Sequence, residues 1–285
     1  MKQIIADITS QLSAVYPADE AEALAWWIAE ELTGLSRTQL QFGDKGTTNF
    51  PNLQEIIDRL LHFEPIQYIF GHTLWCGLDL KVTPATLIPR PETAELVERI
   101  AHRKSEIGNC RVLDIGTGSG CIAIALKKAH PEWQVTGIDI SAEAISVAKE
   151  NAIRNNVEAS FLQMDIFSDE TEGIEPFSGG ETGENPPYDI VVSNPPYICE
   201  KEKADMRPNV LNFEPHSALF VPDNDPLVFY RRIAQLKLGR HLFFEINEAF
   251  GAAMQALLAE NGYTDIQITN DIYGKQRIIE GRMAK

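Results

Sequence analysis

A short segment, Asn194-Pro-Pro-Tyr197, follows a buried-type apolar run at Asp189–Ser193. An amide nitrogen is a poor nucleophile because its lone pair is delocalised into the carbonyl group. Two oxygen acceptors aimed at its N–H groups would orient it and stabilise the positive charge that develops on nitrogen. Asn194 offers a side-chain carbonyl, Pro195 offers a backbone carbonyl, and the two prolines hold both oxygens rigidly. The segment predicts group transfer to a planar amide, although a simple turn after a strand uses the same residue types.

A glycine-rich loop, Gly116-Thr-Gly-Ser-Gly120, lies earlier in the chain between a predicted strand and a predicted helix. Glycine lets the backbone turn sharply and approach a ligand, and the first N–H groups of the helix favour polar or anionic groups. The dinucleotide fingerprint would require a third glycine at position 121, where Cys121 stands. This spacing favours an adenosyl ligand without a pyrophosphate over a dinucleotide, with an ordinary strand-to-helix turn as the structural alternative.

Acidic and aromatic residues follow the next two predicted strands. Asp139 ends the second strand, where its carboxylate could accept hydrogen bonds from both ribose hydroxyls. Asp165 is predicted to end the third strand and to hold an adenine edge, while Phe167 stacks on the adenine face. The residues that we expect to contact the cofactor are therefore Gly116, Thr117, Gly118, Ser119, Gly120, Asp139, Asp165, Phe167 and Asn194.

Alternating strand and helix patterns indicate how these residues are positioned. Such alternation predicts a mainly parallel, doubly wound α/β sheet, in which ligands bind at the carboxyl ends of the strands. The last two strands have only a short turn between them and should pair antiparallel at one edge. The predicted strands are 111–115, 134–140, 160–166, 188–193, 241–246, 265–269 and 276–281, and the predicted helices are 92–102, one through Ile122 and Leu126, 142–155, 226–238 and 251–261.

The N-terminal part of the chain has a different pattern. Apolar residues at helical spacing predict a small helical bundle over residues 1–71, with stripes around Ile8, Ile28 and Ile57. Residues 72–91 read as a β-hairpin centred on Gly77 and a rigid proline-rich linker. Residues 92–285 form the third predicted region, the sheet domain. Within it, the acidic, Gly- and Pro-rich stretch 168–187 is predicted to be a mobile surface loop.

The overall composition narrows the class of protein. The 285 residues carry a net charge of -16, which argues against broad nucleic-acid binding because phosphate contacts require clustered Lys and Arg. No apolar run is long enough for a membrane span, and the N-terminus lacks the apolar core of a signal peptide. The scattered cysteines and histidines predict no disulfide framework and no metal site. We therefore expect a reduced, cytoplasmic protein.

Beyond these features, the chain resembles the PrmC/HemK family, the peptide chain release factor glutamine methyltransferases, over nearly its whole length. The Asn-Pro-Pro-Tyr motif alone also occurs in adenine-N6 DNA methyltransferases, whereas the Ile-Pro-Arg-Pro-Glu-Thr segment is far more specific. The matching segments are Glu64-Pro-Ile-Gln-Tyr-Ile-Phe-Gly71, Thr86-Leu-Ile-Pro-Arg-Pro-Glu-Thr93, the glycine loop, Asn194-Pro-Pro-Tyr197, Phe213-Glu-Pro215 and Tyr273-Gly-Lys-Gln-Arg277.

The resemblance implies a helical N-terminal domain that recognises the substrate, a hairpin linker and a seven-stranded class I methyltransferase domain. It implies S-adenosyl-L-methionine as the methyl donor, and as substrate the glutamine of the Gly-Gly-Gln motif in class 1 release factors. The implied catalytic residues are Asn194, Pro195 and Tyr197, whose ring can pack on the planar substrate group. The implied substrate-binding residues are Asn194, Pro195, Pro196, Tyr197, Arg90 and Glu92.

Other functions fit parts of the pattern. Within enzymes these are an adenine-N6 nucleic-acid methyltransferase and a ribosomal-protein glutamine methyltransferase, and outside enzymes an adenosyl-binding scaffold. The chain departs from the family pattern at Asn212, where relatives often carry Arg, and in the length of the acidic stretch 168–187. We expect a monomer that binds a release factor, with no direct contact to nucleic acid or membrane.

Overall fold

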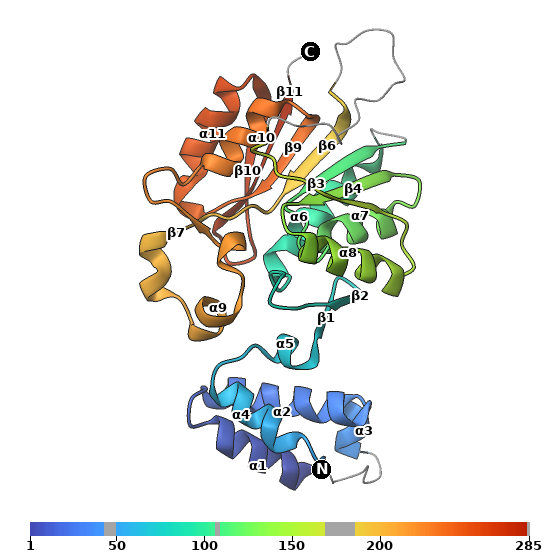
Figure 1. Cartoon of the computed structure of the whole chain (residues 1–285), viewed down its shortest axis with the longest axis vertical. Helices are drawn as coiled ribbons and strands as arrows, with labels where there is room; N and C mark the ends of the chain where they lie inside the picture. The colour runs from blue at the N-terminus through green and yellow to red at the C-terminus, as the bar shows by residue number, and fades with distance from the viewer. Residues whose placement is uncertain (43–49, 106–108, 169–185, 284–285) are drawn as a thin grey trace. The chain divides into compact units, whose positions relative to one another are not determined.

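The computed structural model describes residues 1–42, 50–105, 109–168 and 186–283 (Figure 1). The chain divides into two compact units, one formed by Met1–Gly71 with Arg207–Phe213 and the other by His72–Met206 with Glu214–Lys285. The hairpin and the proline-rich segment cluster with the second unit instead of standing apart as a linker. The acidic stretch predicted to be a mobile loop lies almost entirely outside the described residues.

A seven-stranded sheet forms the centre of the second unit, as the sequence predicted. The strands lie in the order β10-β11-β9-β6-β3-β4-β5, and the neighbours from β9 to β5 are parallel. The predicted antiparallel pair at one edge is confirmed, with β11 joining β10 to β9. The strands are β3 (Arg111–Ile115), β4 (Gln134–Asp139), β5 (Ser160–Gln163), β6 (Tyr188–Ser193), β9 (Gly239–Glu245), β10 (Tyr263–Asn270) and β11 (Gln276–Met283).

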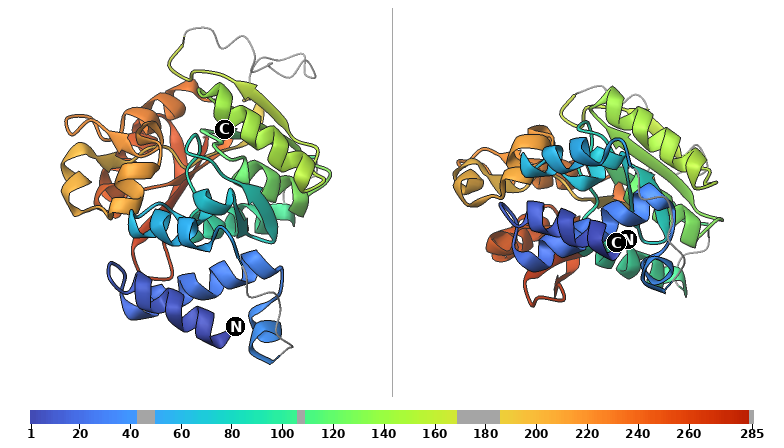
Figure 2. Two further views of the ribbon diagram at one scale, coloured as in Figure 1. Left: turned by 60° about the horizontal axis from the view of Figure 1, so that its bottom comes forward. Right: turned by 90° about the horizontal axis from the view of Figure 1, so that it is seen from below.

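Helices cover both faces of this sheet (Figure 1, Figure 2). Successive side chains of a strand point to opposite faces, so the buried strand β3 supplies Val112 to one apolar core and Leu113 to the other. The first core is completed by α6 (Pro91–Ala101), α7 (Cys121–Ala129) and α8 (Ala142–Arg154), and the second by α10 (Val228–Leu236) and α11 (Gly251–Glu260).

The third parallel strand is shorter than predicted. β5 ends at Gln163, so the prediction that Asp165 ends this strand is wrong. The cause is a local turn, because the Phe167 N–H donates to Asp165 Oδ1 at 2.8 Å and the Ser168 N–H donates to the Asp165 carbonyl at 3.1 Å. Asp and Asn side chains commonly replace strand hydrogen bonds with such turns. Asp165 and Phe167 therefore lie in the loop that follows β5.

Short elements between β6 and α10 were not predicted. β7 (Ile198–Cys199) pairs in parallel with β8 (Phe220–Val221), and 3-10 turns span Glu200–Asp205 and His216–Ala218. Two-residue strands are too short to produce a periodic sequence pattern. The adjoining helix α9 (Pro208–Phe213) belongs to the first unit.

The first unit is helical, as predicted. Its core gathers apolar residues of α1, α2, α4 and α5, with Ile8, Ile28 and Ile57 almost completely buried. The buried stripe of the first helix ends at Leu12, and Val15 lies beyond the end of that helix and is 38% exposed. The helices are α1 (Lys2–Leu12), α2 (Ala18–Thr33), α3 (Arg37–Phe42), α4 (Leu53–Leu61) and α5 (Ile66–Phe70). Within the described ranges, no helix is long and apolar enough to cross a membrane.

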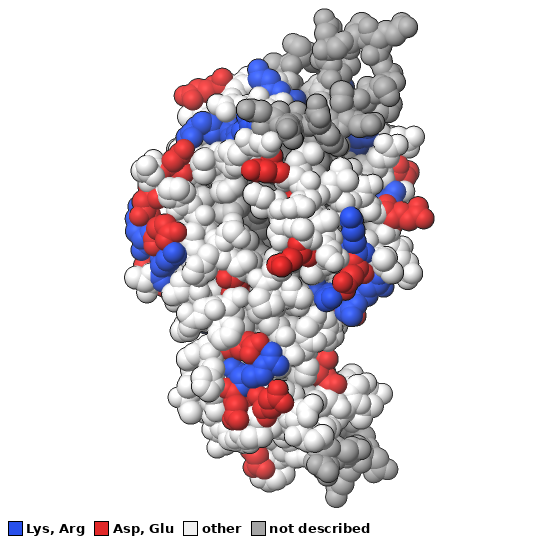
Figure 3. All heavy atoms as spheres, viewed as in Figure 1, with Lys and Arg blue, Asp and Glu red and all other residues white. Residues whose placement is uncertain are grey.

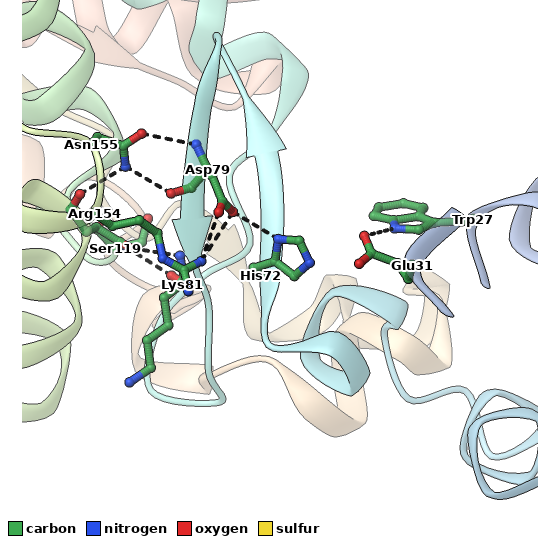
Figure 4. A network of polar contacts seen from close by, with 9 residues as sticks. Trp27, Glu31, His72, Asp79, Lys81, Ser119, Arg154 and Asn155 are labelled. Carbon is green, nitrogen blue, oxygen red and sulfur yellow. Dashed lines mark hydrogen bonds and ion pairs between the residues drawn. The ribbon is translucent and has the colours of Figure 1, made fainter. Parts of the chain in front are cut away.

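The predicted hairpin is present and is attached to α8. β1 (His72–Trp75) and β2 (Leu78–Lys81) are antiparallel, and Cys76 and Gly77 turn with φ of 49° and 69°, as a two-residue hairpin requires. Figure 4 shows side chains of α8 reaching the backbone of β2, where Asn155 pairs with Asp79. Asn151 binds Lys81 in the same way and also donates to the Ser119 carbonyl at 2.8 Å. One buried amide thus joins the hairpin to the glycine loop.

Candidate active site

A cavity of about 520 Å³ opens at the carboxyl ends of β3, β4 and β6. This is the position at which open α/β sheets bind their ligands, and the volume suits a small-molecule cofactor. Segments from several parts of the sheet unit form its wall. They are 84–87 and 89–90, Thr93, 115–119 and 121–122, 138–141 with Glu143, 164–167, 193–196, Pro215, 217–218, Phe229 and Ile233.

The glycine loop forms one side of this cavity. Gly116, Gly118 and Gly120 have φ of 72°, 54° and 80°, a backbone region that other residues rarely adopt. A Cβ at Gly116 would meet no atom within 4 Å, whereas one at Gly120 would lie 3.0 Å from Ala148 of α8. The first glycine therefore leaves room for a ligand and the third allows close helix packing. Thr117 and Ser119 also line the cavity, but Gly120 does not.

Asp139 both lines the cavity and holds the glycine loop. Its Oδ2 accepts the Gly118 N–H at 2.9 Å, and its Oδ1 accepts the Ser141 N–H at 2.9 Å. Each carboxylate oxygen has a second lone pair, so both remain able to accept a ribose hydroxyl. The carboxylate therefore has a structural role, and the ligand role predicted for it stays a prediction.

The loop after β5 brings Asp165 and Phe167 to the same cavity. The Phe167 ring is 44% exposed and meets Phe229 of α10 edge to face, with centroids 5.3 Å apart. Arg232 of α10 holds this loop by donating from Nε to the Ile166 carbonyl at 2.6 Å and from Nη2 to the Ser168 carbonyl at 3.0 Å. The partly exposed ring can take a stacking partner, and α10 fixes its position.

Asn194, Pro195 and Pro196 line the same cavity as the glycine loop. They follow β6, which pairs directly with β3, the strand that leads into the glycine loop. The prediction that these two strands are neighbours is confirmed. Asn194 Nδ2 donates to Thr93 Oγ1 at 3.2 Å, an interaction across 101 residues of sequence.

Tyr197 does not line this cavity. Its hydroxyl donates to Glu245 Oε1 at 3.0 Å, and its ring packs against the apolar core beneath the site. Burial and the neighbouring carboxylate raise the pKa of Tyr197 far above its ordinary value. The structure thus places the Tyr197 ring against the apolar core and not in the cavity wall.

Arg90 and Glu92 also occupy different positions. Arg90 lines the cavity and donates to Glu214 Oε1 at 2.6 Å, and the same buried carboxylate accepts the Ile88 N–H at 3.1 Å. Glu214 therefore fastens the segment before α6, which forms part of the wall. Glu92 is half-buried at the start of α6 and lies outside the cavity wall.

Several residues around the site were not predicted from the sequence. Thr93 and Glu245 are almost completely buried and joined by a hydrogen bond of 2.7 Å between Thr93 Oγ1 and Glu245 Oε2. Thr93 and Glu214 each lie in a segment that resembles the PrmC/HemK family. This resemblance is the sequence feature from which a role in the site could have been predicted. Glu245 ends β9 directly after the apolar run 242–244, and a buried carboxylate at such a position requires a hydrogen-bond partner.

Asp114 is another buried carboxylate, directly before the glycine loop. Its Oδ2 accepts the Thr117 hydroxyl at 2.6 Å and the Ala123 N–H at 3.3 Å. Burial raises the pKa of Asp114 to about 7, against the lowering effect of these two hydrogen bonds. Across the described part of the chain, no group of three His, Cys, Asp or Glu side chains is arranged to hold a metal ion.

Comparison with solved structures agrees with this architecture. The catalytic domain of hMettl16 in complex with MAT2A 3'UTR hairpin 1 gives a TM-score of 0.55 at 16% identity, covering 82% of this chain and 92% of that one. The N-terminal domain of human METTL16 in complex with SAH gives 0.51 at 16% identity, covering 82% and 85%. Similarity at this level shows the shared Rossmann-like methyltransferase fold and nothing about substrates.

Sequence comparisons are more specific. Residues 3–71 match the PrmC N-terminal domain and residues 92–212 match the methyltransferase small domain. The release factor glutamine methyltransferase of Bacteroides thetaiotaomicron is 43% identical over 98% of this chain and 99% of its own length. Those of Flavobacterium psychrophilum (40%, covering 94% of both) and Streptococcus pneumoniae (36%, covering 98% and 97%) are also similar. The chain belongs to the release factor glutamine methyltransferase family.

Proposed function

We propose that this protein transfers a methyl group from S-adenosyl-L-methionine to the side-chain amide nitrogen of the glutamine in the Gly-Gly-Gln motif of class 1 release factors. The observation that carries the proposal is the shared cavity, which Asn194 and Pro195 line together with the glycine loop at the ends of two adjacent strands. Methyl transfer requires the acceptor nitrogen and the donor to meet in one enclosed space. The names of the relatives supply the identity of the protein substrate.

The residues of the cavity fit S-adenosyl-L-methionine. The open space at Gly116 leaves room for a ligand beside the loop, Asp139 offers carboxylate oxygens for ribose hydroxyls, and the exposed Phe167 ring offers a face for adenine. When bound, this cofactor supplies an electrophilic methyl group on a sulfonium sulfur. We assign its binding to Gly116, Thr117, Gly118, Ser119, Asp139, Asp165, Phe167 and Asn194, with Gly120 acting through helix packing.

In the proposed reaction, this chain positions and stabilises the acceptor. Asn194 Oδ1 and the Pro195 carbonyl accept the two N–H groups of the substrate amide, which directs its nitrogen lone pair at the methyl group. Their partial negative charges stabilise the positive charge that grows on nitrogen as it forms its bond to carbon. The methylated amide then loses a proton to solvent, so no strong base is required. Pro196 stiffens the turn, and Tyr197 supports it from below.

The two units have separate roles in this proposal. Residues 1–71 recognise the protein substrate, and the sheet unit, to which the hairpin and the proline-rich segment at 72–91 belong, carries out methyl transfer. We further propose that the protein acts as a cytoplasmic monomer on proteins and not on nucleic acid. The net charge of -16 supports this, as does Figure 3, where the described Lys and Arg side chains on the face shown lie among Asp and Glu side chains.

A labelling experiment tests the substrate assignment. Incubating the protein with methyl-labelled cofactor and, separately, a class 1 release factor, a ribosomal-protein fraction and DNA should label the release factor alone. The label should disappear when the glutamine of its Gly-Gly-Gln motif is changed to alanine. Label on DNA or on a ribosomal protein instead would support one of the other methyltransferase functions, and cofactor binding without label would support a scaffold.

Changing Asn194 tests the site. In Asn194→Ala the rate of transfer should fall by about 100-fold to 1,000-fold, as when one stabilising group is lost from a transition state, while the Kd of the cofactor changes little. Asn261→Ala is a matched control, because Asn261 only binds the Leu257 carbonyl at the end of α11. Full activity in Asn194→Ala would contradict the role given to this side chain.

A further inference from the structure

A chain of hydrogen bonds leads from Asn194 in the cavity wall, through Thr93, to a buried carboxylate. Asn194 Nδ2 donates to Thr93 Oγ1, and Thr93 Oγ1 donates to Glu245 Oε2. The other carboxylate oxygen, Oε1, accepts the Tyr197 hydroxyl. Thr93 is 2% exposed and Glu245 is 1% exposed, so water does not compete for these bonds.

We propose that Thr93 and Glu245 are positioning residues that determine which end of the Asn194 side-chain amide faces the substrate. The inference rests on the proposed function and deepens it. Neither residue touches the reacting atoms in this proposal, and both act through Asn194.

The single proton of the threonine hydroxyl sets this orientation. An ionised carboxylate can only accept hydrogen bonds, so Thr93 must donate its proton to Glu245. The hydroxyl oxygen then remains an acceptor, and only the NH₂ end of Asn194 can bind to it. The carbonyl end is left for the cavity.

The orientation matters because the two ends of an asparagine amide have nearly the same shape but opposite polarity. A glutamine substrate presents an NH₂ group to this part of the site. Asn194 Oδ1 can accept one of those hydrogens, whereas an inverted Asn194 would place its own NH₂ against that of the substrate. Such a donor-to-donor contact leaves buried polar groups without partners and costs binding and rate.

The negative charge of Glu245 is therefore needed for this orientation of the Asn194 amide. Burial raises the pKa of Glu245, while the hydrogen bonds from Thr93 and Tyr197 and the charge of Arg277 oppose that increase. The other titratable neighbours are Glu92 of α6 and Tyr230 of α10, whose hydroxyl donates to the Glu245 backbone carbonyl at 2.8 Å. Arg277 of β11 is held in place by Asp271 and by the Ile246 carbonyl. A protonated Glu245 could donate to Thr93 and permit the inverted amide.

Variants of Thr93 separate the effect of its hydroxyl group from the effect of the shape of its side chain. Thr93→Val keeps the branched shape and removes the hydroxyl, and Thr93→Ser keeps the hydroxyl. We expect Thr93→Val to lower kcat for methylation of the release factor by about 100-fold, as a misplaced catalytic group does, with cofactor Kd and Tm close to wild type. Thr93→Ser should restore most of the activity. Thr73→Val is the matched control, a buried threonine of β1 outside the cavity wall.

Glu245→Gln provides a second, independent measurement. Since Thr93 acts as the link between Glu245 and Asn194, the double variant Thr93→Val/Glu245→Gln should be no slower than the slower single variant. The positioning role of Thr93 and Glu245 is contradicted if Thr93→Val is as active as wild type or if Thr93→Ser is as slow as Thr93→Val. It is also contradicted if the double variant loses kcat by the product of the two single losses. Failure of the wild-type protein to methylate the release factor would instead contradict the proposed function.

Discussion

At the scale of single residues, the site depends on buried carboxylates that do not line the cavity themselves. Asp114, Glu214 and Glu245 each accept hydrogen bonds from groups that line or support the cavity. Burying a charge is costly unless hydrogen bonds compensate for it, so such residues persist where they hold other groups in place. They give this site its geometry at the expense of stability.

Asp114 gives a prediction for the pH dependence of stability. Between its ordinary pKa of 3.8 and its folded pKa of about 7, the folded protein keeps a proton that the unfolded chain has released. The free energy of unfolding therefore falls as pH rises through this window, by up to about 1.4 kcal/mol for each step of one in pH. Asp114→Asn removes this titration, so its stability relative to wild type should improve from pH 4 to about pH 7 and then level off.

Urea unfolding at several pH values measures this effect. Glu158→Gln, a change of the same charge at an exposed position after α8, controls for the loss of one negative charge. A stability difference between Asp114→Asn and wild type that stays constant over this pH range would count against the assignment.

At the scale of elements, α10 determines the position of the loop that carries Phe167. The bonds from Arg232 to two backbone carbonyls and the contact between Phe229 and Phe167 join this helix to a loop with little regular structure of its own. Charge-assisted hydrogen bonds of this kind are stronger than neutral ones. The loop that is proposed to bind adenine therefore depends on a helix that is distant in the sequence.

Changing Arg232 to methionine tests this connection. We expect the Kd for S-adenosyl-L-methionine to rise by about 10-fold, equivalent to about 1.4 kcal/mol, because the loop loses its fixed position. The neighbouring Arg231→Met is the matched control, since Arg231 pairs with Asp225 and does not contact the loop. Isothermal titration calorimetry of both variants measures the change, and equal affinities would disprove the role of Arg232.

The elements themselves were largely predictable. The alternation of strands and helices, the hairpin and the antiparallel edge follow from hydrophobic periodicity and turn residues, and the structure confirms them. The early end of β5 was not predictable, because Asp165 replaces strand hydrogen bonds with a turn that the apolar pattern does not indicate. The short strands β7 and β8 have too few residues for any pattern.

At the scale of the whole molecule, the cavity is built entirely from one of the two units. Every residue of its wall belongs to the sheet unit, and the helical unit has an apolar core of its own. Because each unit has its own core, one unit can bind the protein substrate while the other carries out the chemical step.

Removing residues 1–71 tests this division of roles. The remaining protein should bind S-adenosyl-L-methionine with a Kd close to that of the whole chain. Its kcat/KM for an intact release factor should fall by at least about 10-fold, because a recognition surface worth about 1.4 kcal/mol or more is lost. A short Gly-Gly-Gln peptide serves as the internal control, since its kcat/KM should be unchanged. Equal losses on both substrates would show that the helical unit supports the active site itself.

The sequence by itself determined the class of fold, the neighbouring strands at the active site and the residues that face the cavity from the glycine loop and the Asn-Pro-Pro turn. These features depend on local spacing and on rules of strand connection, which a sequence displays directly. Only the tertiary structure decided that Tyr197 lies beneath the site, that Arg90 pairs with Glu214, and that Thr93 and Glu245 stand behind Asn194. These contacts join segments more than 40 residues apart, and they exist only because packing brings buried polar groups to the partners that they require.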